Sequence, residues 1–123
     1  MVPTMTTQTR RQLAADPNDL ARFFVERANA GDVEGLVALY EPGAVLAFPT
    51  GDVATGHAEI RQVYEEFLAD RPVLTPGYQR PALVSGSLAL TSTELDTGAV
   101  TVEIAHRQPD GYWLWAVDQP ALL

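Results

Sequence analysis

The chain has 123 residues, the usual length of one domain, and its 46% hydrophobic content is enough to form a core. Its 16 acidic and 8 basic residues give a net charge of −8, which disfavours nucleic acids and anionic membranes as partners. It has no cysteine and only two histidines, which excludes disulfides, thiol nucleophiles and thiolate metal sites. We therefore expect neither a metal nor a cofactor.

The first fifteen residues are polar and predict a flexible tail, 1–15, before a single domain, 16–123. The tail has no apolar segment typical of a signal peptide, and no run of about 20 apolar residues follows it. We therefore expect a cytoplasmic protein.

The first half of the chain predicts three helices. Asp16-Pro17-Asn18-Asp19 is typical of a helix start, and Gly31 ends that helix. Asp32 is expected to cap a second helix that contains Tyr40 and ends at Pro42-Gly43. Residues 44–48 and 53–55 predict a small hairpin. The third helix follows from apolar residues at helical spacing, which are Ile60, Val63, Tyr64, Phe67 and Leu68.

From residue 74 the apolar period changes to two, which indicates strands. The expected strands are 74–85, interrupted by two prolines, then 87–95, 99–107 and 112–119. The turns between them contain Gly86, residues 96–98 and residues 108–111. Helices followed by an antiparallel meander predict an α+β fold.

The last hairpin has two different faces if the turn at 108–111 closes symmetrically. One face then carries Thr101, Glu103, Ala105, Leu114, Ala116 and Asp118. The other is more apolar and carries Val102, Ile104, His106, Trp113, Trp115 and Val117. The pattern alone favours the second face as core, with the two carboxylates in water.

Two segments, 29–40 and 56–64, resemble the opening of ketosteroid isomerase, and the segment 107–113 followed by Asp118 resembles SnoaL-like proteins. The broader similarity is to the SnoaL-like family of the nuclear-transport-factor-two superfamily, and it runs from about Asp16 to the C-terminus. This resemblance implies a cystatin-like cone, in which three helices on a curved antiparallel sheet enclose an apolar pocket. It also implies a homodimer through the outer face of the sheet.

The resemblance reverses the choice of face. The acid-bearing face would line the pocket, together with Phe24, Tyr40, Phe48 and Phe67. The dimer interface would contain Ile104, Trp113, Trp115 and Val117.

The residues that carry steroid isomerisation in that family are missing from this chain. The general-base position holds Phe48, the tyrosine that polarises the carbonyl is Phe24, and the partner acid is Ala105. Only the supporting tyrosine matches, at Tyr64. Ketosteroid isomerase activity is therefore not expected.

Glu103 and Asp118 are the candidate catalytic pair, because two carboxylates in one apolar cavity become one acid and one base. Polyketide cyclases of the SnoaL-like family use an aspartate on a comparable late strand. The alternative is that these acids simply bond to Arg80, Arg107 or a backbone donor. Tyr64 is a third candidate, with an ordinary buried tyrosine as its alternative.

Three functions remain open from the sequence. The first is a cofactor-independent enzyme, such as a cyclase, isomerase, dehydratase or epoxide hydrolase, acting on an apolar oxygenated molecule. The second is a non-catalytic dimeric ligand-binding or accessory domain, and the third is a module whose tryptophan face binds another protein. The sequence does not identify the substrate or the pathway.

Overall fold

The computed structural model describes residues 11–48 and 50–122, and this part of the chain forms an α+β fold as expected. Three α-helices and one 3₁₀ helix lie before residue 71: α2 (Asp19–Asn29), α3 (Val33–Val37), α4 (Gly56–Phe67) and η1 (Leu68–Asp70). The strands are β1 (Tyr40–Ala47), β2 (Val53–Thr55), β3 (Tyr78–Gln79), β4 (Leu83–Ser85), β5 (Leu88–Glu94), β6 (Val100–Arg107) and β7 (Trp113–Leu122).

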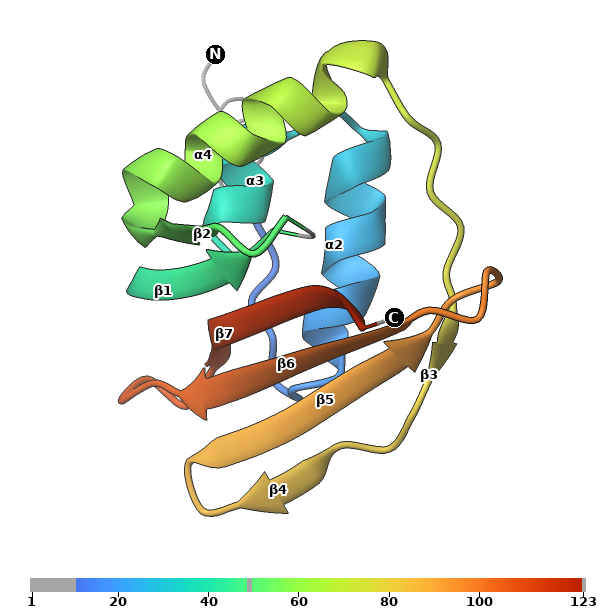
Figure 1. Cartoon of the computed structure of the whole chain (residues 1–123). Helices are drawn as coiled ribbons and strands as arrows, with labels where there is room; N and C mark the ends of the chain where they lie inside the picture. Colours follow the sequence, from blue (N-terminus) through green and yellow to red (C-terminus); the bar gives the residue numbers. More distant parts are fainter. Residues whose placement is uncertain (1–10, 49, 123) are drawn as a thin grey trace, which may run out of the picture.

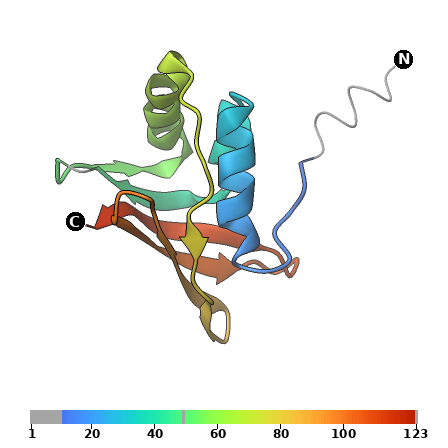
Figure 2. The ribbon, with the colours of Figure 1, turned by 90° about the vertical axis from the view of Figure 1, so that its right-hand side faces the viewer.

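The strands form one curved, unclosed sheet in the order β2-β1-β7-β6-β5-β3, with β4 paired to β5. It is antiparallel except between β1 and β7, which run parallel. The α-helices lie together on one side of the sheet (Figures 1 and 2). The sheet therefore has an inner face toward the helices and an outer face away from them. No helix among the described residues is long and apolar enough to cross a membrane.

The second helix is shorter than predicted, and Tyr40 belongs to a strand. Helix α3 ends at Val37, and Tyr40 pairs with Trp115 on β7. The Trp115 amide also donates to the carbonyl oxygen of Leu39 at 2.8 Å. The apolar periodicity had predicted a helix through Tyr40, but these residues pair with β7 instead. Pro42-Gly43 therefore lies within β1, at the point where the register between β1 and β7 shifts.

The β6–β7 hairpin differs from the predicted register in two ways. Gln108 bonds to Tyr112, so the loop holds three residues and closes through Gly111, whose φ is +90°. This moves the pairing by one residue, so that Ala105 lies opposite Trp115. A second irregularity adds Ala116 to β7, so that Glu103 lies opposite Asp118.

These two shifts decide which side chains point inward. The one-residue shift turns Trp113 and Trp115 toward the helices, where they are 6% and 3% exposed. The bulge then restores the inward direction of Asp118, which is 5% exposed. The predicted hairpin faces are therefore wrong for the tryptophans and right for Asp118.

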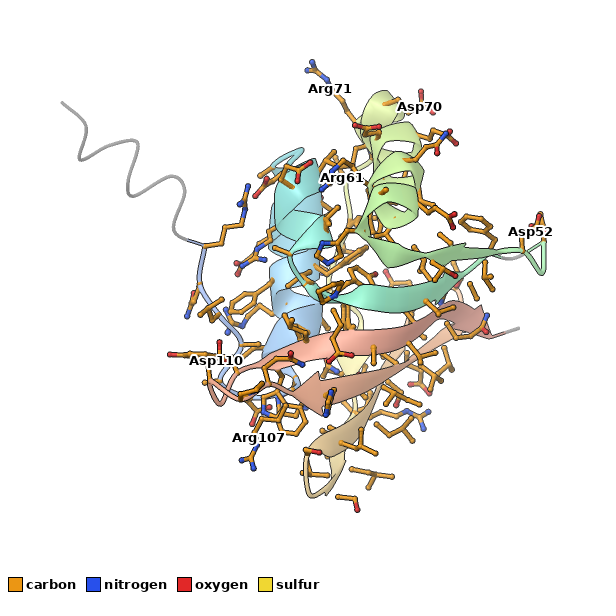
Figure 3. The ribbon with its side chains drawn as sticks, turned by 90° about the vertical axis from the view of Figure 1, so that its left-hand side faces the viewer. Asp52, Arg61, Asp70, Arg71, Arg107 and Asp110 are labelled. Atoms are coloured by element: carbon orange, nitrogen blue, oxygen red, sulfur yellow. The ribbon has the colours of Figure 1, made fainter. Side chains whose placement is uncertain are left out.

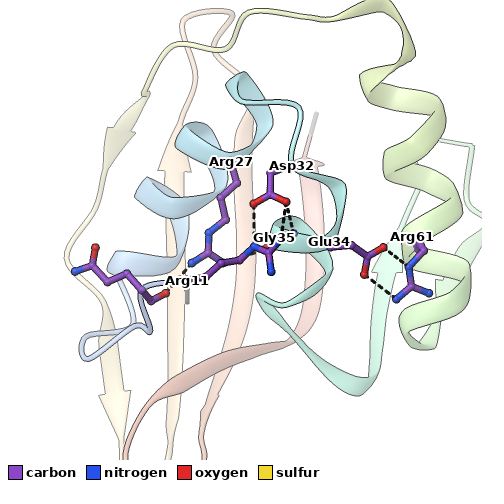
Figure 4. A network of polar contacts seen from close by, with 7 residues as sticks. Arg11, Arg27, Asp32, Glu34, Gly35 and Arg61 are labelled. Atoms are coloured by element: carbon purple, nitrogen blue, oxygen red, sulfur yellow. Dashed lines mark hydrogen bonds and ion pairs between the residues drawn. The ribbon is translucent and has the colours of Figure 1, made fainter. Parts of the chain in front are cut away.

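The chain immediately before α2 packs against the body of the domain. Arg11 donates two hydrogen bonds to Asp32, at 2.9 and 2.8 Å, and Asp32 accepts another from the Gly35 amide (Figure 4). Ala14 is 3% exposed and pairs with Trp113. The predicted tail is therefore wrong for residues 11–15, and residues 1–10 lie outside the described part of the chain.

Candidate functional site

Glu103 and Asp118 are directly opposite each other on the inner face of β6 and β7. Thr91 of β5 lies opposite Glu103, and the three residues form an inner polar row across the sheet. All three are buried, with exposures of 2% for Thr91 and 5% for each acid. Side chains directly opposite on antiparallel strands have Cβ atoms about 5 Å apart. The fold thus holds two carboxyl groups next to each other in its interior.

A chain of hydrogen bonds connects Asp118 to helix α4. The Tyr40 hydroxyl donates to Asp118 Oδ2 at 2.5 Å, and the Tyr40 and Tyr64 hydroxyls are also 2.5 Å apart. Because Tyr40 has only one hydroxyl hydrogen, Tyr64 must donate to Tyr40 while Asp118 is ionised. If Asp118 is protonated and donates to Tyr40, both bonds can reverse. The chain can therefore move a proton between Asp118 and Tyr64.

Glu103 has a separate partner. Thr91 Oγ1 donates to Glu103 Oε1 at 2.7 Å, and Thr101 also bonds to this carboxyl group. These bonds favour the ionised form, but burial dominates and raises the pKa of Glu103 above its usual range.

Burial also raises the pKa of Asp118, to about 7, and the neighbouring charge of Glu103 adds to this effect. The hydrogen bond from Tyr40 acts in the opposite direction. The pKa values of Tyr40 and Tyr64 are raised as well, mainly by burial and then by the charge of Asp118. A carboxyl group with a pKa near 7 can both accept and donate a proton at neutral pH.

In the described part of the chain, no arginine pairs with Glu103 or Asp118. Arg80 pairs instead with Glu94 at 2.7 Å. Arg107 lies at the hairpin end of β6 and points away from the domain (Figure 3). Neither Arg80 nor Arg107 therefore forms the ion pair that would have neutralised the charge of these acids.

Aromatic rings surround the hydrogen-bonded chain. Trp115 has ring-centroid distances of 5.3 Å to Tyr40 and 6.2 Å to Phe24, and Phe24 lies 5.9 Å from Tyr64. Phe67 lies 6.4 Å from Tyr64 and is 41% exposed, so it forms the outer end of this aromatic cluster. The cluster lies between the helices and the sheet, where a pocket was expected.

The other predicted pocket residues divide into two groups. Ala105 is fully buried on the inner face, Thr101 bonds to Glu103, and Phe48 is half-buried against the core. Leu114 pairs with His106 and alternates with the inward tryptophans, and Ala116 is the extra residue of the bulge. The assignment of Leu114 and Ala116 to the pocket is therefore wrong.

The expected dimer interface needs a correction too. Trp113 and Trp115 are packed beneath the chain's own helices and present no surface to a second copy. Ile104 and Val117 are 39% and 43% exposed on the outer face, so their place at an interface stays a prediction.

Two surface hollows lie near the site without reaching the acids. One, of about 30 Å³, lies between the segment 11–14 and Trp113. The other, of about 340 Å³, lies between β2 and α4 and is lined by Phe48, Val53, Ala54, Glu59, Gln62, Val63 and Glu66. Ala54 is joined to Asp118 through Leu46, which pairs with both residues. The larger hollow is therefore two strands, or about 10 Å, from the acid pair.

Among the described residues, no three histidine, aspartate or glutamate side chains come together as metal ligands. The absence of a metal or cofactor from the function remains a prediction.

The sequence reasoning missed Thr91 and the role of Tyr40. Thr91 could have been found from the turn at 96–98, because Leu95 bonds to Ala99 there and the same register brings Thr91 opposite Glu103. Tyr40 could not have been found in this way, because its strand pairs with a segment far away in sequence.

The SnoaL-like domain matches residues 20–118 of this chain. The chain belongs to the SnoaL-like family. No curated protein matches its sequence.

Three solved structures show how widely the fold of this SnoaL-like chain is shared. A candidate calcium/calmodulin-dependent protein kinase type II association domain from Thiobacillus denitrificans superposes with a TM-score of 0.74 at 11% identity, over 92% of this chain and 100% of that chain. A ketosteroid isomerase-like protein from Erwinia carotovora has a TM-score of 0.64 at 19% identity, over 83% and 89% of the two chains. An NTF2-like protein with a cystatin-like fold from Novosphingobium aromaticivorans has a TM-score of 0.61 at 22% identity, over 85% and 78%.

The match over residues 20–118 confirms the family resemblance, and the three structures confirm the cystatin-like fold. At such identities they show the fold alone, and the same fold supports many functions. The chemistry of this SnoaL-like domain has to be argued from its own interior.

Proposed function

We propose that this SnoaL-like domain binds a small, mostly apolar, oxygenated molecule against the inner polar row and exchanges a proton with it. The observation that carries this proposal is the pair of buried carboxyl groups, Glu103 and Asp118, with no cation beside them among the described residues. Burying a carboxylate without a cation costs several kcal/mol, so packing does not explain the pair. Perturbed acids of this kind concentrate at functional sites.

Asp118 is the proposed acid and base, because its pKa of about 7 lets it occupy both states at neutral pH. Glu103 helps by raising that pKa. Tyr64 stands at the far end of the hydrogen-bonded chain and is the group through which a proton would reach a ligand beside α4. Cyclisation, isomerisation, dehydration and epoxide opening all fit such a pair without a cofactor.

A non-catalytic ligand-binding domain is the second candidate. The raised pKa of Asp118 fits it as well, because a protonated carboxyl group can donate a hydrogen bond to a ligand oxygen without transferring the proton. Both candidates require a ligand at the inner polar row, and they differ in whether the ligand leaves chemically changed.

The test is a screen of small neutral compounds followed by NMR on the labelled protein at pH 6 and pH 8. We expect some compounds to shift resonances of the inner polar row and of Tyr64, with an affinity that changes between the two pH values. In Asp118→Asn this pH dependence should disappear, whereas the exposed control Glu65→Gln should keep it. If no compound in the screen perturbs the interior, the proposal is wrong.

The proposed partner on the outer face is a second copy of the chain. Leu83, Leu90, Ile104 and Val117 pair in turn across β4, β5, β6 and β7, and we call them the outer apolar row. Their exposures are 69%, 42%, 39% and 43%. Continuous apolar patches on a sheet face usually mark an interface. In a two-fold dimer the same patch meets itself, and an apolar row is complementary to a second apolar row. The cytoplasmic location likewise stays a prediction.

A further inference from the structure

The indole N–H of Trp115 is the one buried side-chain polar group without a hydrogen-bond partner among the described residues. Trp115 is only 3% exposed. A buried donor left unpaired costs about 1–3 kcal/mol, and buried polar groups in proteins are nearly always paired. A phenylalanine could pack against Phe24 and Tyr40 without this cost. Packing therefore explains the ring of Trp115 and leaves its N–H unexplained.

The surroundings of Trp115 join this unpaired donor to the acid pair. The Trp115 ring packs on the Tyr40 ring at 5.3 Å, and the Tyr40 hydroxyl bonds to Asp118 at 2.5 Å. The single hydrogen of that hydroxyl is already used, so Tyr40 cannot donate elsewhere while Asp118 is ionised. Trp115 is then the nearby donor that an incoming acceptor can use.

The aromatic cluster also offers a way in. It runs from Trp115 through Phe24 and Tyr64 to Phe67, which is 41% exposed. Phe24 is itself only half-buried. Rotation of these two phenylalanine side chains would let an apolar body enter between them and pack against Phe24, Tyr64 and Trp115, because aromatic rings pack well against other apolar groups.

We infer that Trp115 Nε1 donates a hydrogen bond to a carbonyl or hydroxyl oxygen of the ligand, whose apolar body packs against Phe24 and Tyr64. This inference rests on the proposed function and names the chemical group that the site selects. An indole N–H can only donate, so it favours a ligand oxygen over a hydrocarbon of the same shape and over an ammonium group. Trp115 is a binding residue in this account, and Asp118 carries the proton.

The test compares 2-tetralone with tetralin, two bicyclic compounds of nearly equal size of which only the first has a carbonyl oxygen. The chain has two tryptophans, so its ¹H–¹⁵N spectrum contains two indole resonances, assigned with Trp113→Phe and Trp115→Phe. We expect 2-tetralone to shift the Trp115 indole resonance and to leave that of Trp113 nearly unchanged. Trp115→Phe should weaken 2-tetralone binding by about tenfold and leave tetralin binding unchanged.

The outcomes separate this inference from the function on which it rests. Equal affinity for the two compounds, or an unmoved Trp115 indole resonance, would overturn the role of Trp115. If 2-tetralone still shifts the Asp118 carboxyl resonance in that case, the proposed function survives. If 2-tetralone moves neither resonance, the inference fails and the proposed function loses its support from this class of ligand. Should Trp115→Phe not fold, the wild-type indole shift decides alone.

Discussion

At the residue scale, Asp118 ties the stability of this SnoaL-like domain to pH. Its pKa rises from 3.8, the value of an unperturbed aspartate, to about 7 in the fold, mainly because the group is buried. Between these two pH values the folded chain holds a proton that the unfolded chain has released. Stability from this group is therefore complete below about pH 4 and is lost as the pH rises to about 7.

We predict that Asp118→Asn is more stable than the wild type at pH 8 and that the difference shrinks as the pH falls toward 4. A pKa unit is worth about 1.4 kcal/mol, so the gain at pH 8 should be a few kcal/mol, at most about 4. The amide oxygen of asparagine can still accept the Tyr40 hydrogen bond. The measurement is urea unfolding at several pH values.

Glu65→Gln is the matched control, because Glu65 is exposed and should give no such trend. A destabilised Asp118→Asn at pH 8 would show that the carboxylate is a structural acceptor, and the functional argument would lose its basis.

At the scale of elements, the predicted helices and strands were largely right and the register of the last hairpin was not. Periodicity located α4, because its apolar face repeats at helical spacing from its first residue, Gly56, onward. It also located β5, β6 and β7 to within a few residues. Glycine and proline marked the turns between them, and these signals are local.

The register was harder because a single residue decides it. Gly111 in a left-handed conformation closes a three-residue loop, whereas the sequence also allowed a symmetric four-residue turn. The bulge at Ala116 could not be found from the sequence, because β7 pairs with both β6 and β1 around this residue, and β1 lies far away along the chain. Asp118 was assigned to the interior correctly, although the pairing used to reach that assignment was wrong. The tryptophans were misplaced because the family resemblance outweighed their hydrophobicity.

The connection between α2 and α3 gives a prediction about stability. Gly35 lies under Asp32, whose carboxylate is fixed by Arg11 and by the Gly35 amide. A Cβ atom at position 35 would lie 2.1 Å from Asp32 Oδ2 and 2.8 Å from Arg11 Nε. Gly35→Ala must therefore displace the pair. Loss of its charge-assisted hydrogen bonds outweighs the gain of about 1 kcal/mol that alanine has over glycine in a helix, and we expect a net cost of about 1–2 kcal/mol in unfolding free energy.

Gly43→Ala is the control for this change. A Cβ atom at Gly43 has no neighbour within 4 Å, and this glycine has no positive φ. Its thermal unfolding temperature should stay near that of the wild type, whereas that of Gly35→Ala should fall by several degrees. Equal unfolding temperatures for the two variants would show that Arg11 and Asp32 do not hold the start of the chain.

At the scale of the whole molecule, the helices cover one face of the sheet and leave the outer apolar row uncovered. We predict that two copies associate through this face and that Ile104→Lys converts the dimer to a monomer. The lysine would place a charge in the middle of the row, between Leu90 and Val117. Because Ile104 is already 39% exposed, the folded monomer should lose little stability.

Sedimentation velocity at micromolar concentration is the measurement. Val73→Lys is the control, because Val73 is 84% exposed and lies outside the sheet. A monomeric wild type, or a dimer that persists in Ile104→Lys, would contradict the proposed interface between two copies of the chain.

The central claim is that the interior holds a carboxyl group that gains and loses a proton near neutral pH. A ¹³C NMR titration of the Asp118 carboxyl carbon, assigned by comparison with Asp118→Asn, measures this directly. We predict a midpoint near pH 7. A midpoint near 4, the value of an aspartate in water, would contradict the claim and with it the proposed proton exchange.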